Sequence, residues 1–417
     1  MSARRFLELL WFGAMSLAIT EVAALALISD EHKLYNDLMK DYQKWVRPVQ
    51  NASASVEVNF GITLQQILEV NEARGYVSWN IWLHMGWKDV SLRWNASEYS
   101  GIDKLRIPID QLWKPDLAAY NSIGDKYHSS FTSMGLVNYA GDVIWIPPVI
   151  LNTACIFDYT YYPYDSQICD IKIGSWHHDG GKMNLTRGHD RVDISTYLKN
   201  NGWELVGSIP LKRNVIKYDC CPESYIDLTA TFTIKRRKTY VTSVLVVPGV
   251  ILAFLIPFIF MFPPDAGEKI NLGVGLILGY ILLLLIGDGI NDGKLMSSTP
   301  MLFRYYTANI VLVGLSMILS MCIVQLWRER GRASGPPNLA STILIDGLGC
   351  VLCVNRNNYI RRPRAVSVDA EGSMDTDKIG KDGPDTSLEW KLLAMVLDRI
   401  LFILFLVISL VMAAIMV

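Results

Sequence analysis

The sequence predicts an extracellular β-sandwich of the immunoglobulin-like kind, with an N-terminal helix, followed by a bundle of four transmembrane helices. The chain is therefore expected to be α+β overall. Two observations carry this prediction. Apolar residues gather in four late runs, and the roughly two hundred residues before them alternate between apolar and polar in short stretches. Long apolar runs are typical of membrane spans, whereas alternation is typical of half-buried strands.

Four apolar runs in the second half of the chain have a length that suits a bilayer. They are Val241 to Phe262, Ile270 to Ile286, Tyr305 to Leu326 and Ile400 to Val417. A span needs about 17 to 25 mostly apolar residues. The second run is the shortest and is rich in glycine, so taken alone it also fits a buried core helix. Its three neighbours favour a membrane span for all four.

Residues 1–28 predict a secretory signal. Arg4 and Arg5 precede a largely apolar stretch from Phe6 to Ile28, which is the order of a charged and then an apolar region in such signals. Glu8 and Glu21 are unusual in a signal, so an uncleaved anchor is the alternative. Three Asn-x-Ser/Thr sequons support translocation of the region that follows and are its expected glycosylation sites, at Asn51, Asn95 and Asn184.

Basic residues indicate which segments lie on each side of the membrane. The cluster Lys235 to Lys238 is on the outer side of the first span, against the positive-inside bias. That bias governs short loops, and a long translocated domain overrides it. The loop between the third and fourth spans is rich in arginine, as a cytoplasmic segment is, and its part from Ser367 to Ser387 has the composition of a flexible segment. We therefore expect a multi-pass protein of the cell membrane with its N-terminal domain outside.

The N-terminal domain begins with a helical pattern and continues with strands. Leu34, Leu38 and Tyr42 have helical spacing within Glu31 to Trp45, which predicts a helix there. Alternating stretches separated by turn residues predict strands, the clearest of which are Val77 to Trp82, Val143 to Ile146, Ile168 to Ile173 and Asp227 to Ile234.

Cysteine spacing is the most specific signal in the chain. Cys155 and Cys169 enclose a short loop that contains Tyr162-Pro163-Tyr164-Asp165. In an oxidising compartment the two thiols would pair and stabilise the fold by about 3 kcal/mol on the chain-entropy model. Cys220 and Cys221 are adjacent in the chain, where a bond between them closes a strained ring and is seldom an ordinary cross-link.

With the four spans, this loop resembles the signature loop of the pentameric Cys-loop ligand-gated ion channels, and the adjacent cysteines are similar to those of α-type nicotinic acetylcholine receptor subunits. The resemblance implies a disulfide between Cys155 and Cys169 and another between Cys220 and Cys221. It also implies this organisation: a signal at 1–28, a ligand-binding domain at 29–238, three transmembrane helices in 239–327, a cytoplasmic loop at 328–389 and the fourth helix at 390–417.

The resemblance assigns a binding site to aromatic residues. The principal face would comprise Tyr120, Trp176, Tyr218, Tyr225 and the pair Cys220 and Cys221, and the facing surface of a neighbouring subunit would comprise Trp82, Leu136 and Ile146. Aromatic faces bind a quaternary ammonium through cation–π contacts of about 0.5 to 2 kcal/mol each. The expected ligand is a small cationic amine resembling acetylcholine, and the expected assembly is a homopentamer because one chain carries both faces.

Most Trp and Tyr residues of a β-sandwich pack in its core, and we assign Trp87 and Trp94 to packing on that ground. The matched site also departs from the family pattern. His177 and His178 follow the central Trp176, and Ala118-Ala119 precede Tyr120. These departures leave the identity of the agonist open, so a channel gated by another ligand, or an accessory subunit, is the alternative.

Charged residues outside the pocket suggest a gating relay and a pore. The resemblance implies that Lys172 and Asp227 exchange a salt bridge with Tyr218, and that Glu72, Asp165 and Arg236 meet near the membrane. Surface charges without a role are the alternative. In the second span, Glu268 would form a cation-selecting ring at the inner mouth. The expected pore-facing residues are Glu268, Asn271, Leu278, Leu282 and Leu285. The alternative is that Leu278 and Leu282 pack against other helices.

Other functions are less consistent with the sequence. No catalytic set is evident, so the chain is not expected to be an enzyme, and we expect no cofactor. The histidines have no metal-ligand spacing, and Cys350 and Cys353 lack the second pair that a zinc site needs. The net charge of −1 gives no indication of nucleic-acid binding. Membrane lipid and permeating cations are the remaining expected partners, and a membrane enzyme or a transporter is the competing class.

Overall fold

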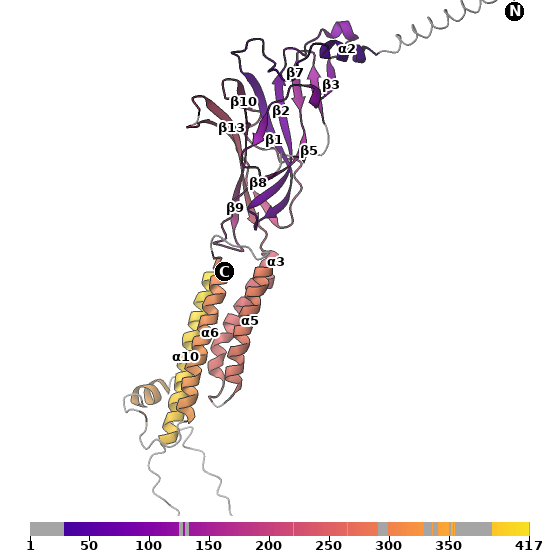
Figure 1. Ribbon diagram of the computed structural model, residues 1–417. Helices are drawn as coiled ribbons and strands as arrows, with labels where there is room; N and C mark the ends of the chain where they lie inside the picture. The colour runs from indigo at the N-terminus through magenta and orange to yellow at the C-terminus, as the bar shows by residue number, and fades with distance from the viewer. Residues whose placement is uncertain are drawn as a thin grey trace, which may run out of the picture. The chain divides into compact units, whose positions relative to one another are not determined.

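The computed structural model describes residues 29–124, 128–129, 133–219, 221–264, 266–290, 299–328, 336, 341–349, 352, 354 and 386–416. The predicted signal and the cysteines at 350 and 353 lie outside these residues. The chain divides into two compact units, Met1–Phe157 with Ser166–Arg237, and Asp158–Asp165 with Lys238–Val417. The first unit contains the strands and the second contains the long helices (Figure 1).

The first unit opens with helix α2 (Asp30–Met39), which Ser29 caps by accepting a hydrogen bond from the His32 amide. The predicted helix extended to Trp45, and that part of the prediction was wrong. Tyr42 lies beyond the helix, where its hydroxyl donates to Asp89 at 2.6 Å and accepts from the Trp113 amide at 2.9 Å. The helical spacing had placed Tyr42 on the helix, whereas these hydrogen bonds hold its side chain in the segment that follows α2.

Two sheets build the rest of the first unit. The larger sheet has the order β10-β1-β2-β7-β6-β3, and β8 pairs with β2 and β5. Its strands are β1 (Val56–Asn71), β2 (Tyr76–Lys88), β3 (Lys104–Pro108), β5 (His128–Ser129), β6 (Met134–Asn138), β7 (Asp142–Trp145), β8 (Pro148–Ala154) and β10 (Met183–Arg187). Two short 3-10 helices, η1 (Ala96–Tyr99) and η2 (Ile109–Gln111), flank β3.

The smaller sheet positions the candidate site. Its order is β11-β13-β9-β4, and β12 pairs with β13. The strands are β4 (Leu117–Ala119), β9 (Ser166–Ser175), β11 (Trp203–Val206), β12 (Leu211–Lys217) and β13 (Ser224–Arg236). The predicted strands within β2, β7, β9 and β13 are all present, because each alternating stretch buries one side of its strand.

The core of the first unit lies where the two sheets face each other. Trp79 of β2 packs on Phe232 of β13 with ring centroids 4.4 Å apart, and both side chains are buried. The Trp79 indole donates to the Thr153 hydroxyl at 2.9 Å, so its polar atom is satisfied inside the core. Trp87 is also buried, as its assignment to packing requires.

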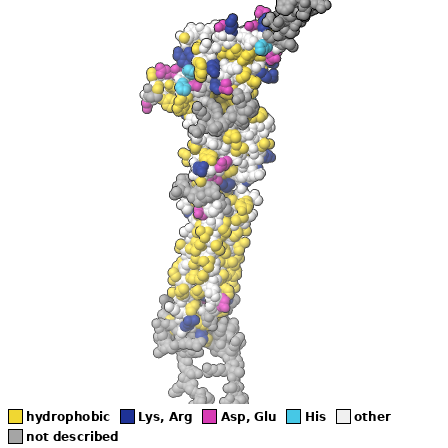
Figure 2. All heavy atoms as spheres, turned by 45° about the vertical axis from the view of Figure 1, so that its right-hand side comes forward, with side chains coloured by type: hydrophobic (Ala, Val, Ile, Leu, Met, Phe, Trp, Pro, Cys, Tyr) yellow, Lys and Arg dark blue, Asp and Glu magenta, His cyan; other side chains and the backbone are white. Residues whose placement is uncertain are grey.

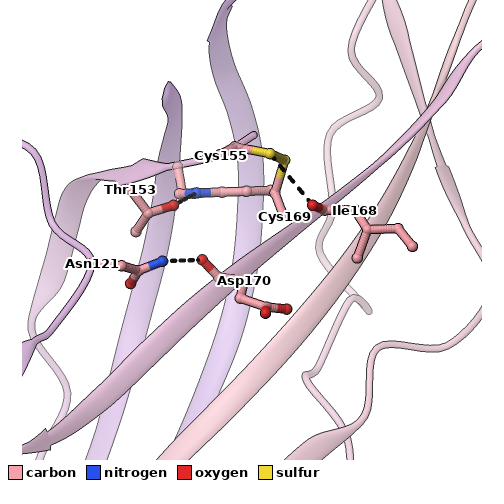
Figure 3. Close-up of a disulfide and its surroundings, with 7 residues drawn as sticks. Asn121, Thr153, Cys155, Ile168, Cys169 and Asp170 are labelled. Atoms are coloured by element: carbon pink, nitrogen blue, oxygen red, sulfur yellow. Dashed lines mark hydrogen bonds between the residues drawn. A yellow bond between two sulfur atoms is a disulfide. The ribbon is translucent and has the colours of Figure 1, made fainter. Parts of the chain in front are cut away.

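A disulfide joins Cys155 to Cys169, as the resemblance implies (Figure 3). Cys155 follows β8 of the larger sheet, and Cys169 lies in β9 of the smaller one. Beside it, the Asn121 amide donates to the Asp170 carbonyl at 2.7 Å. The cross-link therefore connects the two sheets.

The second unit contains four helical segments that are long and apolar enough to cross a membrane: Thr239–Met261, Glu268–Gly289, Met301–Arg328 and Leu388–Met416. The first combines α3 (Thr239–Val241), a π-helical turn η3 (Thr242–Val246), α4 (Val247–Leu255) and a 3-10 turn η4 (Ile256–Met261). Pro248 and Pro257 lack amide hydrogens, which accounts for these interruptions. The others are α5 (Glu268–Ile290), α6 (Met301–Arg328) and α10 (Thr386–Met416).

Buried tyrosines hold these helices together. The Tyr280 hydroxyl of α5 donates to the Gly249 carbonyl at 2.9 Å, and the Tyr306 hydroxyl of α6 donates to the Leu245 carbonyl at 2.7 Å. A π-helical segment, η5 (Ser341–Leu348), packs Ile345 into a buried cluster with residues of α10. The face in view is mostly hydrophobic along the helices (Figure 2).

The loop tip 158–165 packs within the helical unit. The amide of Met301, at the start of α6, donates to the Thr160 carbonyl at 3.0 Å. The Lys238 ammonium lies 4.9 Å from the centroid of the Tyr164 ring, and the Tyr162–Pro163 peptide bond is cis. The segment between the paired cysteines thus contacts the first and third spans.

Candidate functional site

A cavity of about 320 Å³ opens beside the smaller sheet. Its walls are formed by side chains on or just beyond β4, β9, β12 and β13, which are neighbours in that sheet. Adjacent strands bring together residues that are far apart in the sequence. The lining residues are Tyr120, Lys172, Ser175, Trp176, Tyr218, Cys221 and Tyr225.

Two aromatic pairs shape this cavity. The Tyr120 and Trp176 rings meet edge to face with centroids 6.2 Å apart, and the Tyr218 and Tyr225 rings do so at 5.7 Å. Trp176 is 66% exposed in the single chain, so its indole face is open. The sequence therefore brings all four predicted aromatic residues to one cavity.

Tyr120 is fixed by its surroundings. Its hydroxyl donates to the Ser175 carbonyl at 2.6 Å, and a side chain at Gly174 would come within 2.3 Å of that hydroxyl oxygen. Glycine is therefore required for this close approach. Burial, followed by the nearby Tyr218 and Asp227, raises the pKa of Tyr120 to about 12, so its ring is neutral at physiological pH.

Asp116 fixes the loop that carries Trp176. Its carboxylate accepts hydrogen bonds from the Ser175 hydroxyl at 2.7 Å and the His177 amide at 2.7 Å, and its carbonyl accepts from the Trp176 amide at 3.2 Å. The His177 ring also lies 3.0 Å from this carboxylate. The sequence analysis gave Asp116 no role. The motif Trp113-Lys-Pro-Asp116, which precedes Tyr120, was the signal that could have indicated it.

A charged pair lies at the cavity wall. The Lys172 ammonium is 3.4 Å from the Asp227 carboxylate, which is almost fully buried. The other Asp227 oxygen accepts from the Asn214 amide at 2.7 Å and the Thr229 hydroxyl at 3.0 Å. These two neutral donors, which sequence reasoning missed, satisfy the buried carboxylate. Lys172 also lies 5.8 Å above the Tyr120 ring.

The adjacent cysteines are only partly described. Cys221 lines the cavity and is disulfide-bonded. Cys220, the partner that the resemblance implies for it, lies outside the described residues. The pairing of the two therefore stays a prediction.

The residues expected on the facing surface of a neighbouring subunit lie on the larger sheet. Trp82 is on β2, Leu136 is on β6, and Ile146 follows β7. Ile144 pairs with both Gly86 and Leu136 across the strands, so Trp82 and Leu136 share one side of the sheet. Trp82 and Ile146 are exposed, and none of the three lines the cavity around Trp176.

The second predicted charge cluster is described in part. Arg236 and Glu72 form a partly buried salt bridge of 2.9 Å, and the Arg236 guanidinium stacks 4.4 Å from the Trp203 ring. Asp165 belongs to the helical unit, whose placement relative to these residues is not determined. Its meeting with Arg236 stays a prediction.

The predicted pore residues share one side of α5. Glu268, Asn271, Leu278, Leu282 and Leu285 are all exposed in the single chain. The opposite side is buried against the other spans and includes Leu276, Tyr280 and Leu283. The leucines at 278, 282 and 285 are therefore more than half exposed in the single chain, and their pore-lining role stays a prediction.

Sequence reasoning missed a buried ion pair at the start of α5. The Lys269 ammonium, fully buried, lies 2.5 Å from the Asp398 carboxylate of α10. Lys269 also lies 5.7 Å from the centroid of the Phe260 ring. Asp398 was the available signal, because a charge at the edge of an apolar span is costly unless it is paired.

The predicted sequons differ in exposure. Asn51 and Asn95 are exposed, while Asn184 is half-buried and accepts a hydrogen bond from Arg213 at 2.9 Å. Glycosylation at all three stays a prediction. Within the described residues, no cluster of three or more His, Cys, Asp or Glu side chains is arranged to hold a metal ion.

Acid is expected to destabilise the first unit through His84. Burial lowers the pKa of His84 below 6.5, an effect that His189 reinforces and Asp193 opposes. The unfolded chain then binds a proton near pH 6.5 that the folded chain does not, so stability falls as the pH drops below about 6.5 until the folded pKa is reached. We expect the melting temperature of the full chain to fall less with acid in His84→Gln than in the wild type. Equal slopes for the two proteins would contradict this.

Comparisons with known proteins agree with this architecture. Residues 31–238 match the family model of the neurotransmitter-gated ion-channel ligand binding domain. The neuronal acetylcholine receptor subunit alpha-9-II of Oncorhynchus mykiss is 31% identical over 84% of this chain, and subunit alpha-6 of Mus musculus is 32% identical over 78%. The chain belongs to the family of neurotransmitter-gated ion channels. Members of this family are channels and not enzymes.

Membership of this family assigns a location to each of the two units. The first is the extracellular ligand-binding domain, and the four apolar helices of the second span the cell membrane. The acetylcholine receptor subunit beta-like 1 of Drosophila melanogaster is a further relative, 31% identical over 85% of this chain. The matches span 63% of the Oncorhynchus relative, 66% of the Mus relative and 67% of the Drosophila relative.

Proposed function

We propose that this chain is a subunit of a pentameric, cation-selective channel that opens when a small cationic amine binds between subunits. The observation that carries the proposal is the cavity of about 320 Å³ in which Tyr120, Trp176, Tyr218 and Tyr225 converge. Electron-rich rings replace the water around an ammonium ion, and each contact contributes about 0.5 to 2 kcal/mol. The names of the relatives make acetylcholine the first candidate ligand.

The larger sheet supports a homopentamer. Trp82 and Ile146 are exposed apolar residues, and they do not line the cavity around Trp176. A second copy of the chain can therefore offer them to the cavity of the first. A ring closes when such a contact between different surfaces repeats by a fixed rotation.

Closure of the cavity around an amine would act on the pair of Lys172 and Asp227. Lys172 lines the cavity and contacts Asp227 on the strand that also carries Tyr225. A tyrosine hydroxyl that approached Lys172 would compete with Asp227 for the ammonium. This exchange is the proposed first step of gating, with Tyr218 as the approaching residue.

The pore is proposed to follow the exposed side of α5. Five copies of Glu268 would place a ring of negative charge at the cytoplasmic end, and such rings select cations. Leu278 and Leu282 would form an apolar constriction that closes the channel by losing its water.

Cation selectivity can be tested on the chain expressed by itself in oocytes. Currents evoked by acetylcholine should reverse at a potential that shifts when external sodium is replaced and stays constant when chloride is replaced. Glu268→Gln should reduce the cation preference because it removes the ring of charge. A reversal potential that follows chloride would overturn the assignment of Glu268.

A channel gated by a different amine is the second candidate. His177 follows Trp176 in the chain, and its ring lies 3.0 Å from the Asp116 carboxylate that fixes this loop. In the same oocytes, currents evoked by another amine and not by acetylcholine would favour this candidate. An accessory subunit would give no current alone and would give current with a second subunit.

A further inference from the structure

Two arginine side chains join the two sheets of the first unit at the start of β12. Arg213 of β12 donates from Nε to the Leu185 carbonyl at 2.8 Å and from Nη2 to the side-chain oxygen of Asn184 at 2.9 Å. Both acceptors lie on β10 of the larger sheet. In the opposite direction, Arg187 of β10 donates to the Leu211 carbonyl at 3.2 Å. The two arginines therefore cross-link strands that belong to different sheets.

Backbone hydrogen bonds reinforce this link. The Leu211 amide donates to the Asp190 carbonyl at 2.9 Å, and the Val192 amide donates to the Ile209 carbonyl at 3.0 Å. Arg187 is itself oriented by Asp190, whose carboxylate lies 3.2 Å from the guanidinium. The start of β12 is thus fixed to the segment that contains β10 and the residues after it.

The other side of β12 is bonded to the wall of the aromatic cavity. Successive side chains of a strand point to opposite sides, so Asn214 points away from the side of Arg213. The Asn214 amide donates to the Asp227 carboxylate at 2.7 Å and to the Thr229 hydroxyl at 3.0 Å. Asp227 is the residue that pairs with Lys172 at the cavity wall. The start of β12 is therefore held between β10 and this charged pair.

The far end of β12 reaches the cavity directly. Tyr218 follows the last residue of β12, and both Tyr218 and Cys221 line the cavity. Tyr218 is five residues beyond Arg213, which is about 17 Å along an antiparallel strand. β12 is paired with β13 over its whole length, so the two strands form one stiff hairpin. A small rotation at the start of β12 would consequently displace the loop at its end.

We propose that Arg213 is a positioning residue of the amine site: it fixes the start of β12 against β10 and so keeps Tyr218 and Cys221 over the aromatic cavity. Arg213 does not line the cavity, so it acts through the strand and not on the ligand. A guanidinium suits this role, because its rigid fork of donors holds two acceptors in a fixed direction, whereas a lysine ammonium has no such geometry. The inference rests on the proposed function for the identity of the ligand.

Hydrogen exchange of the purified, assembled full chain without ligand tests the positioning itself. Arg213→Gln should speed the exchange of the amides of residues 212–219 about tenfold, since charge-assisted hydrogen bonds at the start of β12 are lost. The amides of β1 and β2 should exchange as in the wild type. Lys212→Gln is the matched control, because it removes the neighbouring exposed positive charge of the same strand, and it should leave the exchange unchanged.

The dissociation rate of acetylcholine from the same assemblies tests the effect on the site. Arg213→Gln should release acetylcholine about tenfold faster and change the association rate less, because the loop no longer stays over the bound amine. Arg213→Lys keeps the charge without the fork and should recover only part of the loss.

Two variants of Asn184 isolate the hydrogen bond. Both remove the glycosylation sequon, but Asn184→Asp keeps an oxygen acceptor for Arg213 and Asn184→Ala does not. Asn184→Ala should speed dissociation about threefold, as expected for the loss of one exposed bond to a charged donor. Asn184→Asp should dissociate at the rate of the wild type.

Four results would overturn the proposal. They are unchanged exchange of residues 212–219 in Arg213→Gln, equally faster exchange in β1 and β2, an unchanged dissociation rate in Arg213→Gln, and equal rates in the two Asn184 variants. A wild-type assembly that does not bind acetylcholine would contradict the proposed function instead. The exchange result, which needs no ligand, would then decide whether Arg213 fixes β12.

Discussion

Replacing Trp176 by Ala is expected to lower the affinity for acetylcholine by about 30-fold in the assembled channel, since a desolvated cation–π contact contributes about 2 kcal/mol. Trp176 lines the cavity with an exposed indole face. The ring of Tyr120 lies 6.2 Å from the Trp176 ring and is held there by its hydrogen bond to the Ser175 carbonyl. The cavity keeps its other rings, so the loss should be large without abolishing binding. Titration of bound ligand on assembled protein measures it.

Trp94→Ala is the matched control. Trp94 is half-buried and donates to the Ile102 carbonyl at 2.7 Å, and it does not line the cavity. Its loss should affect folding more than ligand affinity. Unchanged affinity in an assembled Trp176→Ala variant would place the ligand elsewhere. Equal losses in both variants would point to a general structural effect.

Replacing Lys269 by Met is expected to destabilise the helical unit by about 3 to 5 kcal/mol, because it leaves the Asp398 carboxylate buried without its partner. The double variant Lys269→Met with Asp398→Leu should recover most of the loss, since an apolar pair of similar volume carries no desolvation penalty. The temperature at which the detergent-solubilised assembly dissociates is the measurement.

Lys238→Met separates this effect from the simple loss of a lysine, because Lys238 is exposed. It should change the dissociation temperature little. A double variant as unstable as Lys269→Met alone would show that the charge of Asp398 is not the cause. A Lys269→Met assembly as stable as the wild type would show that water or another cation reaches the carboxylate.

The alternation of strands and the four apolar runs were sufficient to predict the fold class. A strand with one buried side alternates between apolar and polar residues, and a span in hydrocarbon is a continuous apolar run. Both patterns can be read directly from the sequence. Boundaries were less predictable. The helix expected to reach Trp45 ends at Met39, and α10 extends to Thr386, far ahead of the apolar run that begins at Ile400. The part of α10 before Ile400 is stabilised by packing on Ile345 and Val354.

The aromatic residues of the candidate site were found through a resemblance of short motifs, whereas their supporting groups were not. Asp116 bonds to residues about sixty positions away, and Asn214 of β12 bonds to Asp227 on the neighbouring strand β13. A polar side chain gives no sign in the sequence of which distant group it will contact. Only the pairing of β4, β9, β12 and β13 decides these partners.

The sequence by itself determined the two kinds of environment along this chain, the residue types of the cavity and the spacing of the cysteines that close one loop. The tertiary structure decided which of those residues meet. It placed Tyr120 against Gly174, paired Lys172 with Asp227, and joined Lys269 to Asp398 across two spans. The physical reason is that hydrophobic burial depends on local pattern, while hydrogen bonds and ion pairs require a particular partner at about 3 Å, and only the folded chain sets that distance.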